Sequence, residues 1–316
     1  MADCRSSLTE SPGQGTARIA AIMLTMNGRE RTLRALASFS PADRRRADVL
    51  VWDNGSTDRT VEAVRERFPD VHVHWHHTNL GVASGRNAAA ARAMELFAPT
   101  HLLFVDNDLV FTKGFIAALI EPFSFDEQLG QTQAKLRFLR EPDVLNDGGG
   151  CRISFWRGRT TPVGFGEVDR GQRDVPGPCI SCGGAMMVRS DVFRELGGFD
   201  SVFDPTGPED LDFSLRLQKR GYRSLYVPRA MAYHEVSHTF GGGEYSANYA
   251  RVKAQHWLRF LRRHGSLMEQ VGFFAIGAPL ILLRLAVREG RKGNAGALLG
   301  SILGVWAGLR RSHPAS

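Results

Sequence analysis

The chain has 316 residues, of which 43% are hydrophobic and 23% charged. This composition is typical of a water-soluble globular protein and excludes a disordered or fibrous one. The net charge of +7 is concentrated at one end, because residues 251–316 carry 11 Lys and Arg against 2 Asp and Glu. A basic, apolar end behind a neutral-to-acidic body indicates a membrane surface as partner rather than nucleic acid.

This length predicts one large domain with an appendage. We expect residues 1–17 to be a disordered lead-in, residues 18–244 to form the domain and residues 245–316 to form a helical tail. Four cysteines and no signal peptide predict a reducing, cytoplasmic location. Cys179 and Cys182 have C-x-x-C spacing, but no second pair completes a zinc site, so we expect structural packing.

The first half of the domain alternates strands and helices. Apolar runs predict four strands, at Ile19–Thr25, Val49–Trp52, Val71–Trp75 and Leu102–Val105. Helices ending near Phe39, Phe68 and Phe97 follow the first three strands, and Ser56 or Thr57 is expected to cap the second helix. Three such units before a fourth strand predict an α/β fold with a doubly wound, mostly parallel sheet.

The fourth strand ends in Asp106, Asn107 and Asp108. In an open α/β sheet, ligands bind beyond the carboxyl ends of the strands. A pair of carboxylates there is costly unless a cation neutralises it, and Mg²⁺ or Mn²⁺ with oxygen ligands does so. The alternative is a turn of the Asx type that closes the strand.

Polar residues also follow the other strands at the same rim: Thr25, Asn27, Asp53, Arg86 and Asn87. Such convergence favours a nucleotide site. Asp53 can accept a hydrogen bond from a base or ribose, and Arg86 at a helix N-terminus can hold a pyrophosphate. For any single residue, turn or cap chemistry is the alternative.

The second half is less regular. We expect strands at Gly130–Leu139, Gly183–Val188, Ser224–Val227 and Met231–His234, and a short helix at Ser190–Leu196. The Gly- and Arg-rich passage 147–178 lacks apolar periodicity and is long enough to border a substrate. Trp156 and Phe165 within it are candidates for sugar stacking, with packing as the alternative. Glu209 and Asp210 begin a helix, where the helix dipole alone would also favour carboxylates.

Several of these stretches together resemble family 2 of the glycosyltransferases. They are Thr25-x-Asn27, Asp53-Asn54-Gly55-Ser56-Thr57-Asp58, Asn79-Leu80-Gly81 with Arg86-Asn87, Asp106-Asn107-Asp108, Gly183–Met187, Leu196–Asp200 and Glu209–Asp212. The resemblance covers about residues 18–240 and is nearest to the rhamnosyltransferase-like branch. Met26 stands where the family usually has a Tyr that stacks on the base.

The resemblance implies the GT-A fold, with a nucleotide-sugar half at 18–122 and an acceptor half at 123–244. It implies a dTDP- or UDP-sugar donor and a divalent metal held by Asp106, Asp108 and His234, although His234 could be an ordinary loop histidine. Asn107 would join the donor site, His238 could touch the pyrophosphate, and Gly241–Gly243 could hinge a lid. Asp210 would be the base of a single inverting displacement, with Glu209 orienting it or the acceptor.

Three helical stretches form the tail: Tyr245–His264, Val271–Val287 and Ala297–Leu309. The last two are apolar but fall short of the ~20 residues of a membrane span. We expect helices that lie in the membrane interface, flanked by Arg262, Arg263, Arg288, Arg291 and Lys292. A re-entrant hairpin or an oligomer interface is the alternative.

Together these features predict a metal-dependent glycosyltransferase at the inner face of the membrane, with a glycan or lipid-linked acceptor in cell-surface polysaccharide synthesis. A nucleotidyltransferase should show a Gly-rich, basic loop after the first strand, whereas residues 25–34 read Thr-Met-Asn-Gly-Arg-Glu-Arg-Thr-Leu-Arg. A dehydrogenase is excluded because the G-x-G-x-x-G motif does not follow the first strand. The third alternative, a non-catalytic binder of nucleotide-sugars, would not need the acidic residues and His234.

Overall fold

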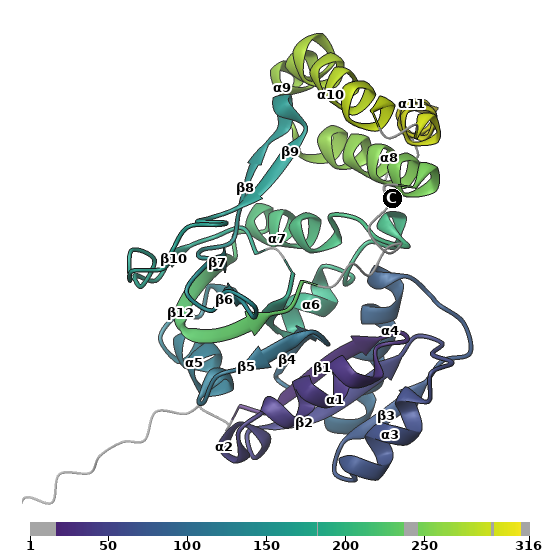
Figure 1. Cartoon of the computed structure of the whole chain (residues 1–316). Coiled ribbons are helices and arrows are strands. Elements are labelled where there is room, and N and C mark those ends of the chain that lie inside the picture. Colours follow the sequence, from purple (N-terminus) through teal and green to yellow (C-terminus); the bar gives the residue numbers. More distant parts are fainter. Residues whose placement is uncertain (1–16, 182, 237–245, 292–293, 311–316) are drawn as a thin grey trace, which may run out of the picture.

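The computed structural model describes residues 17–181, 183–236, 246–291 and 294–310. Its centre is a mixed sheet with strand order β10-β12-β6-β11-β4-β1-β2-β3, with β5 on β12 and β7 on β6 (Figure 1). The nucleotide half supplies four parallel strands, β1 (Ile19–Thr25), β2 (Ala47–Asp53), β3 (His72–Trp75) and β4 (His101–Asp106). The predicted doubly wound α/β fold is confirmed.

The register of these strands decides where their last residues meet. Thr25 of β1 pairs with Asp53 of β2, and Leu24 of β1 pairs with Asp106 of β4. Polar side chains from three strands therefore reach one rim of the sheet, at the carboxyl ends where ligands bind in open α/β sheets. Below the rim, β1 and β4 are almost fully buried, as their unbroken apolar runs require.

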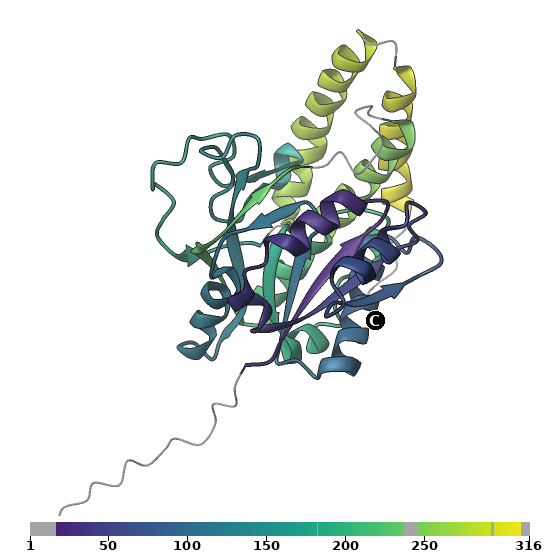
Figure 2. The ribbon, with the colours of Figure 1, turned by 60° about the horizontal axis from the view of Figure 1, so that its bottom comes forward.

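Helices cover both faces of the sheet (Figure 2). One hydrophobic cluster joins the sheet to α1 (Arg29–Ser38), α3 (Thr60–Arg67) and α5 (Phe115–Ile120). The other joins it to α4 (Val82–Phe97), α6 (Ser190–Glu195) and α7 (Glu209–Lys219). Ala21 and Met23 of β1 belong to the first cluster and Ala20 and Ile22 to the second, as the alternation of side chains along a strand requires. Short α2 (Pro41–Arg44) precedes β2.

The acceptor half completes the sheet with β5 (Leu109–Phe111), β6 (Leu129–Phe138), β7 (Leu145–Asp147), β10 (Gly177–Pro178), β11 (Ala185–Arg189) and β12 (Arg223–His234). The prediction of two short final strands is wrong, because β12 runs through both. Its register against β6 shifts between Val227 and Met231. Pro228 lies within this irregularity, where a residue without a backbone N–H is tolerated in a sheet.

The passage 147–178 contains a second, two-stranded sheet. β8 (Cys151–Ser154) and β9 (Arg159–Pro162) pair as an antiparallel hairpin whose turn is Phe155–Gly158. Figure 1 shows this hairpin leaving the main sheet and ending beside the tail helices. Gly158 has φ +61, a conformation that favours glycine.

The tail comprises α8 (Ala247–His264), α9 (Leu267–Gly272), α10 (Ala278–Gly290) and α11 (Ala295–Arg310), with a π-helical turn at Phe273–Gly277. α11 packs closely along α8: Cβ atoms added at Gly300 or Gly304 would collide with the α8 backbone at Ala247 or Arg251. Three predicted helical stretches are thus present, with different bounds.

The prediction that no tail segment reaches the length of a membrane span is wrong. Residues Leu267–Gly290 form 24 residues of continuous helix that are apolar enough to cross a membrane, by length and composition only. Pro279 lies within this helix, in the first turn of α10. The π turn that precedes it accommodates the missing N–H, and such turns let a helix continue past a local defect.

Two predicted features of helix N-termini also differ. Ser56 and Thr57 do not cap α3, which begins after Arg59. The N-terminus of α4 is capped from the acceptor half by Asp204, whose carboxylate accepts from the N–H groups of Ala83 at 2.9 Å and Ser84 at 3.1 Å. A Cβ at Gly81 would collide with this carboxylate, so the approach requires glycine.

Asp204→Ala should therefore lower the free energy of unfolding by about 1–2 kcal/mol, because it leaves two N–H groups of α4 without an acceptor. Urea denaturation measures the change. Asp70→Ala is a matched control, since Asp70 is exposed and, among the described residues, pairs with Arg44 alone. It should cost less than about 0.5 kcal/mol. Equal effects of the two substitutions would show that Asp204 adds nothing as a cap.

Candidate active site

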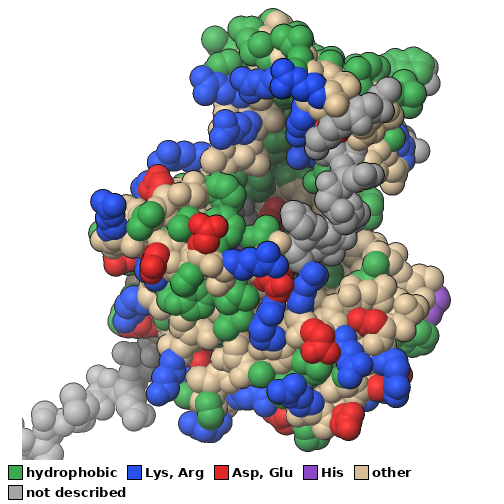
Figure 3. Space-filling view, in the orientation of Figure 1, with side chains coloured by type: hydrophobic (Ala, Val, Ile, Leu, Met, Phe, Trp, Pro, Cys, Tyr) green, Lys and Arg blue, Asp and Glu red, His purple; other side chains and the backbone are tan. Residues whose placement is uncertain are grey.

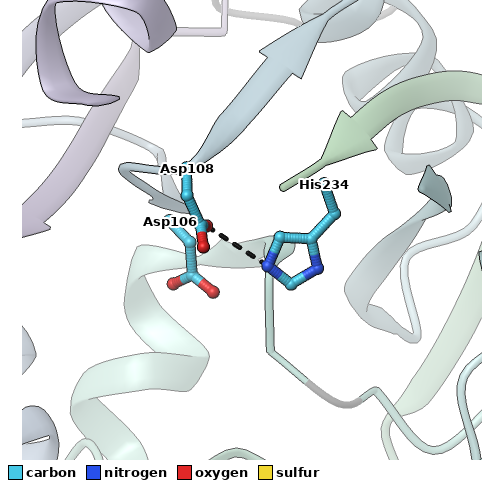
Figure 4. A group of neighbouring side chains, drawn as sticks. All are labelled: Asp106, Asp108 and His234. Carbon is cyan, nitrogen blue, oxygen red and sulfur yellow. Dashed lines mark ion pairs between the residues drawn. The ribbon is translucent and has the colours of Figure 1, made fainter. Parts of the chain in front are cut away.

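Asp106, Asp108 and His234 form one cluster at the rim of the sheet (Figure 4). Each offers a ligand atom, and these atoms lie within 4.8 Å of one another. β12 supplies His234, which pairs with Leu109 of β5, directly after Asp108. Leu109 and His234 are 125 residues apart in the sequence, and the antiparallel pairing of their strands brings together the three residues predicted as metal ligands.

His234 is oriented by a residue that sequence reasoning missed. Nδ1 of His234 lies 2.9 Å from Oδ1 of Asn146 in β7. An amide oxygen can only accept, so Nδ1 carries the proton and Nε2 faces Asp108 Oδ1 at 3.2 Å. Burial lowers the pKa of His234, but the hydrogen bond and charge of Asp108 outweigh it and raise the pKa overall. Orientation through the other ring nitrogen is typical of metal-ligating histidines.

Arg86 connects this cluster to the helix that begins with Glu209. Arg86 is 8% exposed, and its guanidinium donates to Asp106 at 2.8 Å and to Glu209 at 3.1 Å. Burial alone would lower the pKa of Arg86, but the negative charges of Asp106 and Glu209 raise it by more. The pKa is therefore raised overall, and the side chain stays a cation. It lies in the second turn of α4 and not at the capped N-terminus where the sequence placed it.

Glu209 and Asp210 share a buried, crowded setting. Burial and the charge of Asp210 raise the pKa of Glu209, and burial raises that of Asp210, while Arg86 opposes both shifts. Oδ1 of Asp210 accepts from the N–H of Leu211 at 2.7 Å. Oε2 of Glu209 is buried and makes no hydrogen bond within the described residues. The pKa of each carboxyl is therefore raised, and the two titrate as a pair.

Asp53 is fully buried, and only one of its two carboxylate oxygens accepts hydrogen bonds among the described residues. Its Oδ1 accepts from the N–H groups of Gly55 at 3.1 Å and Ser56 at 2.7 Å. Its Oδ2 is buried without a hydrogen-bond partner in the part of the chain that the structure describes. A buried carboxylate oxygen without a donor is costly in free energy, so it suits a ligand that brings an N–H or O–H group.

The rim therefore combines a cluster of side chains that could hold a cation, a buried acceptor without a donor among the described residues and two carboxyls with raised pKa. A model for the family described as "Glycosyltransferase like family 2" matches residues 17–254 of this chain. The chain belongs to glycosyltransferase family 2.

Curated relatives agree with this assignment. The N-acetylglucosaminyl-diphospho-decaprenol L-rhamnosyltransferase of Mycobacterium tuberculosis is 31% identical over 230 residues, which cover 66% of this chain and 73% of that protein. An O-antigen biosynthesis protein of Myxococcus xanthus is 28% identical over 249 residues, covering 72% of this chain and 18% of that protein.

Two solved structures share the fold. A mannosyltransferase from Pyrobaculum calidifontis, in complex with GDP-Man and Mn²⁺, matches with a TM-score of 0.55 and 17% identity, over 97% of this chain and 91% of that one. GalNAc-T7 with UDP, GalNAc and Mn²⁺ matches with a TM-score of 0.58 and 20% identity, over 75% of this chain. The match spans about half of that protein, 48%. These likenesses identify the fold as GT-A.

As a family 2 glycosyltransferase, the protein transfers a sugar from a nucleotide-sugar. The nucleotidyltransferase and the non-catalytic binder are therefore set aside. The predicted kinship with rhamnosyltransferases is confirmed by the mycobacterial relative.

Other predicted donor-site residues make bonds within the protein. Oγ1 of Thr25 is 2.8 Å from Oγ1 of Thr32 and accepts from Nδ2 of Asn107 at 3.0 Å. Oδ1 of Asn27, a residue with φ +48, accepts from the N–H of Thr57 at 2.8 Å. These bonds join the loops at the ends of β1, β2 and β4.

Asn87 lies apart from the rim. Its amide donates to the carbonyl of Phe199 at 2.7 Å and accepts from the N–H of Phe199 at 2.9 Å, which bridges α4 to the acceptor half. Phe165 packs edge-on against Phe138, and Trp156 lies at the hairpin tip against the tail helix. The structure therefore does not bring Asn87 or Trp156 to the rim cluster.

Cys151 and Cys179 are buried free thiols, and burial raises the pKa of Cys179 above its usual range. This agrees with the expected packing role of Cys179. The other predictions on Cys182, His238 and Gly241–Gly243, and the lead-in 1–16, lie outside the described residues.

The bond from His234 to Asn146 generates a prediction. Asn146→Ala should weaken Mn²⁺ binding by about 10- to 100-fold, the usual effect of losing an outer-shell partner of a ligating histidine. Isothermal calorimetry with Mn²⁺ measures it. Asn248→Ala, at an exposed position of α8, is the control and should leave the affinity unchanged. An unchanged affinity in Asn146→Ala would mean that Asn146 does not orient His234.

Proposed function

We propose that this protein is an inverting, metal-dependent glycosyltransferase that acts on a lipid-linked glycan at the membrane surface in cell-surface polysaccharide synthesis. The observation that carries the proposal is the ion-pair chain in which Arg86 joins Asp106 of the donor rim to Glu209 beside Asp210. This chain sets a candidate base next to a candidate metal site, which is the arrangement that a single displacement needs.

The donor is a nucleoside-diphosphate sugar, with dTDP- or UDP-sugars as the first candidates. Asp53 would accept from the base or ribose through its free oxygen. Asp106, Asp108 and His234 would hold Mg²⁺ or Mn²⁺, and the fit rests on two carboxylates and an imidazole whose Nε2 faces the cluster. When bound, the cation would stabilise the charge of the leaving diphosphate. The two structural neighbours were solved with Mn²⁺.

Asp210 is the proposed base. Its ionised carboxylate takes the proton from the acceptor hydroxyl while that oxygen attacks the anomeric carbon opposite the diphosphate. The new C–O bond forms as the bond to the diphosphate breaks, so the anomeric configuration inverts. We assign the proton that the pair retains to Glu209, whose Oε2 makes no hydrogen bond among the described residues and would donate to an oxygen of the acceptor. Arg86 keeps both carboxyls in place.

The acceptor and the location follow from the tail and the relatives. The mycobacterial relative is named for a decaprenol-diphosphate substrate. In Figure 3 hydrophobic side chains cover the top of the molecule, above a row of Lys and Arg. Exposed apolar residues of the helix 267–290 include Leu267, Met268, Val271, Leu283 and Val287. We propose that this face lies on the inner surface of the membrane, because the charged Arg284 lies within the helix and disfavours a full span.

Several of the cations expected to flank this face bind to other residues of the protein instead. Arg263 pairs with Asp200 and Asp212, and Arg288 pairs with Glu289, so both are engaged within the protein. Arg262 donates to the carbonyl of Leu309. Lys292 lies outside the described residues. Membrane contact by these particular residues is therefore not part of the proposal.

Asp210→Asn keeps the shape of the side chain but removes the base, so transfer should fall by about two to four powers of ten. Radiolabelled sugar transfer measures the rate, and calorimetry should show donor affinity within about threefold of the wild type. Asp126→Asn, at the surface between η1 (Glu121–Ser124) and β6, is the control. Near-normal transfer in Asp210→Asn would remove Asp210 from the mechanism.

The raised pKa of Asp210 predicts the pH dependence. The base must be ionised, so kcat should rise with pH through the raised pKa and level off above it. The acid limb should thus lie above the value of about 3.9 that is typical of an ordinary Asp. Rates between pH 4 and 8, with circular dichroism to confirm folding, would test this. An acid limb at the ordinary value would show that burial does not control the base.

A further inference from the structure

A pocket of about 340 Å³ lies where the tip of the β8–β9 hairpin meets the helix 267–290. We call it the arginine pocket. Its lining comprises Trp156, Arg157, Arg159, Gly277, Leu280, Ile281 and Arg284. The helix residues follow i, i+3, i+4 and i+7 spacing, so they form one stripe that faces the hairpin. Neither the catalytic proposal nor the family assignment uses this pocket.

Two glycines allow the hairpin and helix to meet. A Cβ at Gly277 would collide with the carbonyl oxygen of Trp156, and a Cβ at Gly158 would lie 2.6 Å from Cδ1 of Ile281. Gly158 also needs its positive φ of 61°. Contact between these segments, more than a hundred residues apart, is therefore part of the fold and fixes the walls of the pocket.

Three arginines line this pocket, Arg157, Arg159 and Arg284. Arg157 stacks over the ring of Trp156 at 4.5 Å, and Arg159 donates to Oγ1 of Thr161 at 3.0 Å. Among the described residues, neither these two nor Arg284 forms an ion pair, whereas Arg263 and Arg288 of the same region do. Like charges gathered on one site repel, and an anion that binds among them relieves that repulsion.

The remaining wall is hydrocarbon. Leu280 and Ile281 line the pocket, and Phe274, Ile276 and Leu283 are exposed on the same helix. A ligand that fits must combine an anionic head, suited to guanidinium forks, with an apolar chain. Nucleotides and inorganic phosphate lack an apolar chain, and neutral hydrocarbons lack an anionic head.

We propose that the arginine pocket binds the phosphate of a membrane lipid headgroup, with the lipid chains lying along the exposed face of the helix 267–290. The proposal rests on the membrane association proposed above. Figure 1 places the hairpin tip beside α9 and away from the sheet that carries Asp106 and Asp108. The pocket therefore sets how the enzyme sits on the surface, and it is separate from the catalytic rim.

The test uses the full chain and vesicles of phosphatidylcholine with or without phosphatidylglycerol. The wild type should prefer the phosphatidylglycerol vesicles. The triple variant R157Q/R159Q/R284Q should lose about one to two powers of ten of that affinity, given the usual contribution of each basic residue at an anionic surface. All three arginines are exposed, and glutamine is a polar side chain, so we expect the variant to keep the fold.

The matched control is R45Q/R46Q/R65Q, which removes the same charge from exposed positions of the nucleotide half. It should bind within about threefold of the wild type. Restoring charge with R157K/R159K/R284K should recover part of the affinity, because lysine keeps the charge but not the fork. A triple glutamine variant that binds like this control would overturn the proposal, as would a wild type that ignores phosphatidylglycerol.

Thermal shift separates the sources of phosphate. Short-chain phosphatidylglycerol below its micelle concentration should raise the Tm of the wild type and not of the triple glutamine variant. An equal shift with inorganic phosphate would overturn the lipid assignment in favour of a free anion. Donor binding with Mn²⁺, measured in the same proteins, should be unchanged by the triple variant. Loss of donor binding in the wild type would instead count against the proposed enzyme function and leave the pocket result independent.

Discussion

The buried guanidinium of Arg86 is the interaction on which the site depends. Three carboxyls, those of Asp106, Glu209 and Asp210, come together at one rim, and without a cation their mutual repulsion would favour protonation or displacement. Arg86 bonds to the first two and lies near the third. The same helix is capped from the acceptor half by Asp204. The donor and acceptor halves are therefore joined in three ways through α4: by the charge pair of Arg86 with Glu209, by the Asp204 cap and by the hydrogen bonds of Asn87 to Phe199.

A second buried carboxylate joins the catalytic helix to the tail. Asp212 is fully buried and accepts from Arg216 at 2.7 Å, Arg263 at 2.9 Å and His264 at 2.8 Å. Burial would raise the pKa of Asp212, but these partners lower it to about 2. Because Asp212 follows Asp210 in α7 and Arg263 belongs to α8, the tail is fixed to the helix that presents the proposed base. A movement of α8 would therefore also displace α7, which carries Asp210.

Sequence reasoning succeeded where the signal is local. Buried strands are visible as apolar runs, and their ends are marked by polar residues, so Asp53, Asp106 and Asp108 could be placed at one rim before the structure was known. It failed where a residue's partner lies far along the chain. Arg263 reads as a membrane-flanking cation, yet its partner Asp212 is in another helix. Asn146 and Asp204 carry no local signal either. The apolar stretch Val271–Val287 was judged too short for a membrane span, whereas the helix extends over Leu267–Gly290 through a π turn.

The passage 147–178 shows how one irregular stretch can connect both ends of the molecule. Its loop is fixed to the sheet by Asp169, which pairs with Lys135 and Arg137 at 2.7 Å each. Burial opposes ionisation of Asp169, but these partners lower its pKa to about 2, so the attachment persists at any physiological pH. Lys135 lies in β6, beside the strand that carries His234. The hairpin of the same passage reaches the tail through Gly158 and Gly277. The passage is thus attached by charge to β6 and by close packing to the tail helix. If the tail lies on a membrane, as proposed, these two attachments fix how far the strand that carries His234 stands from the membrane surface.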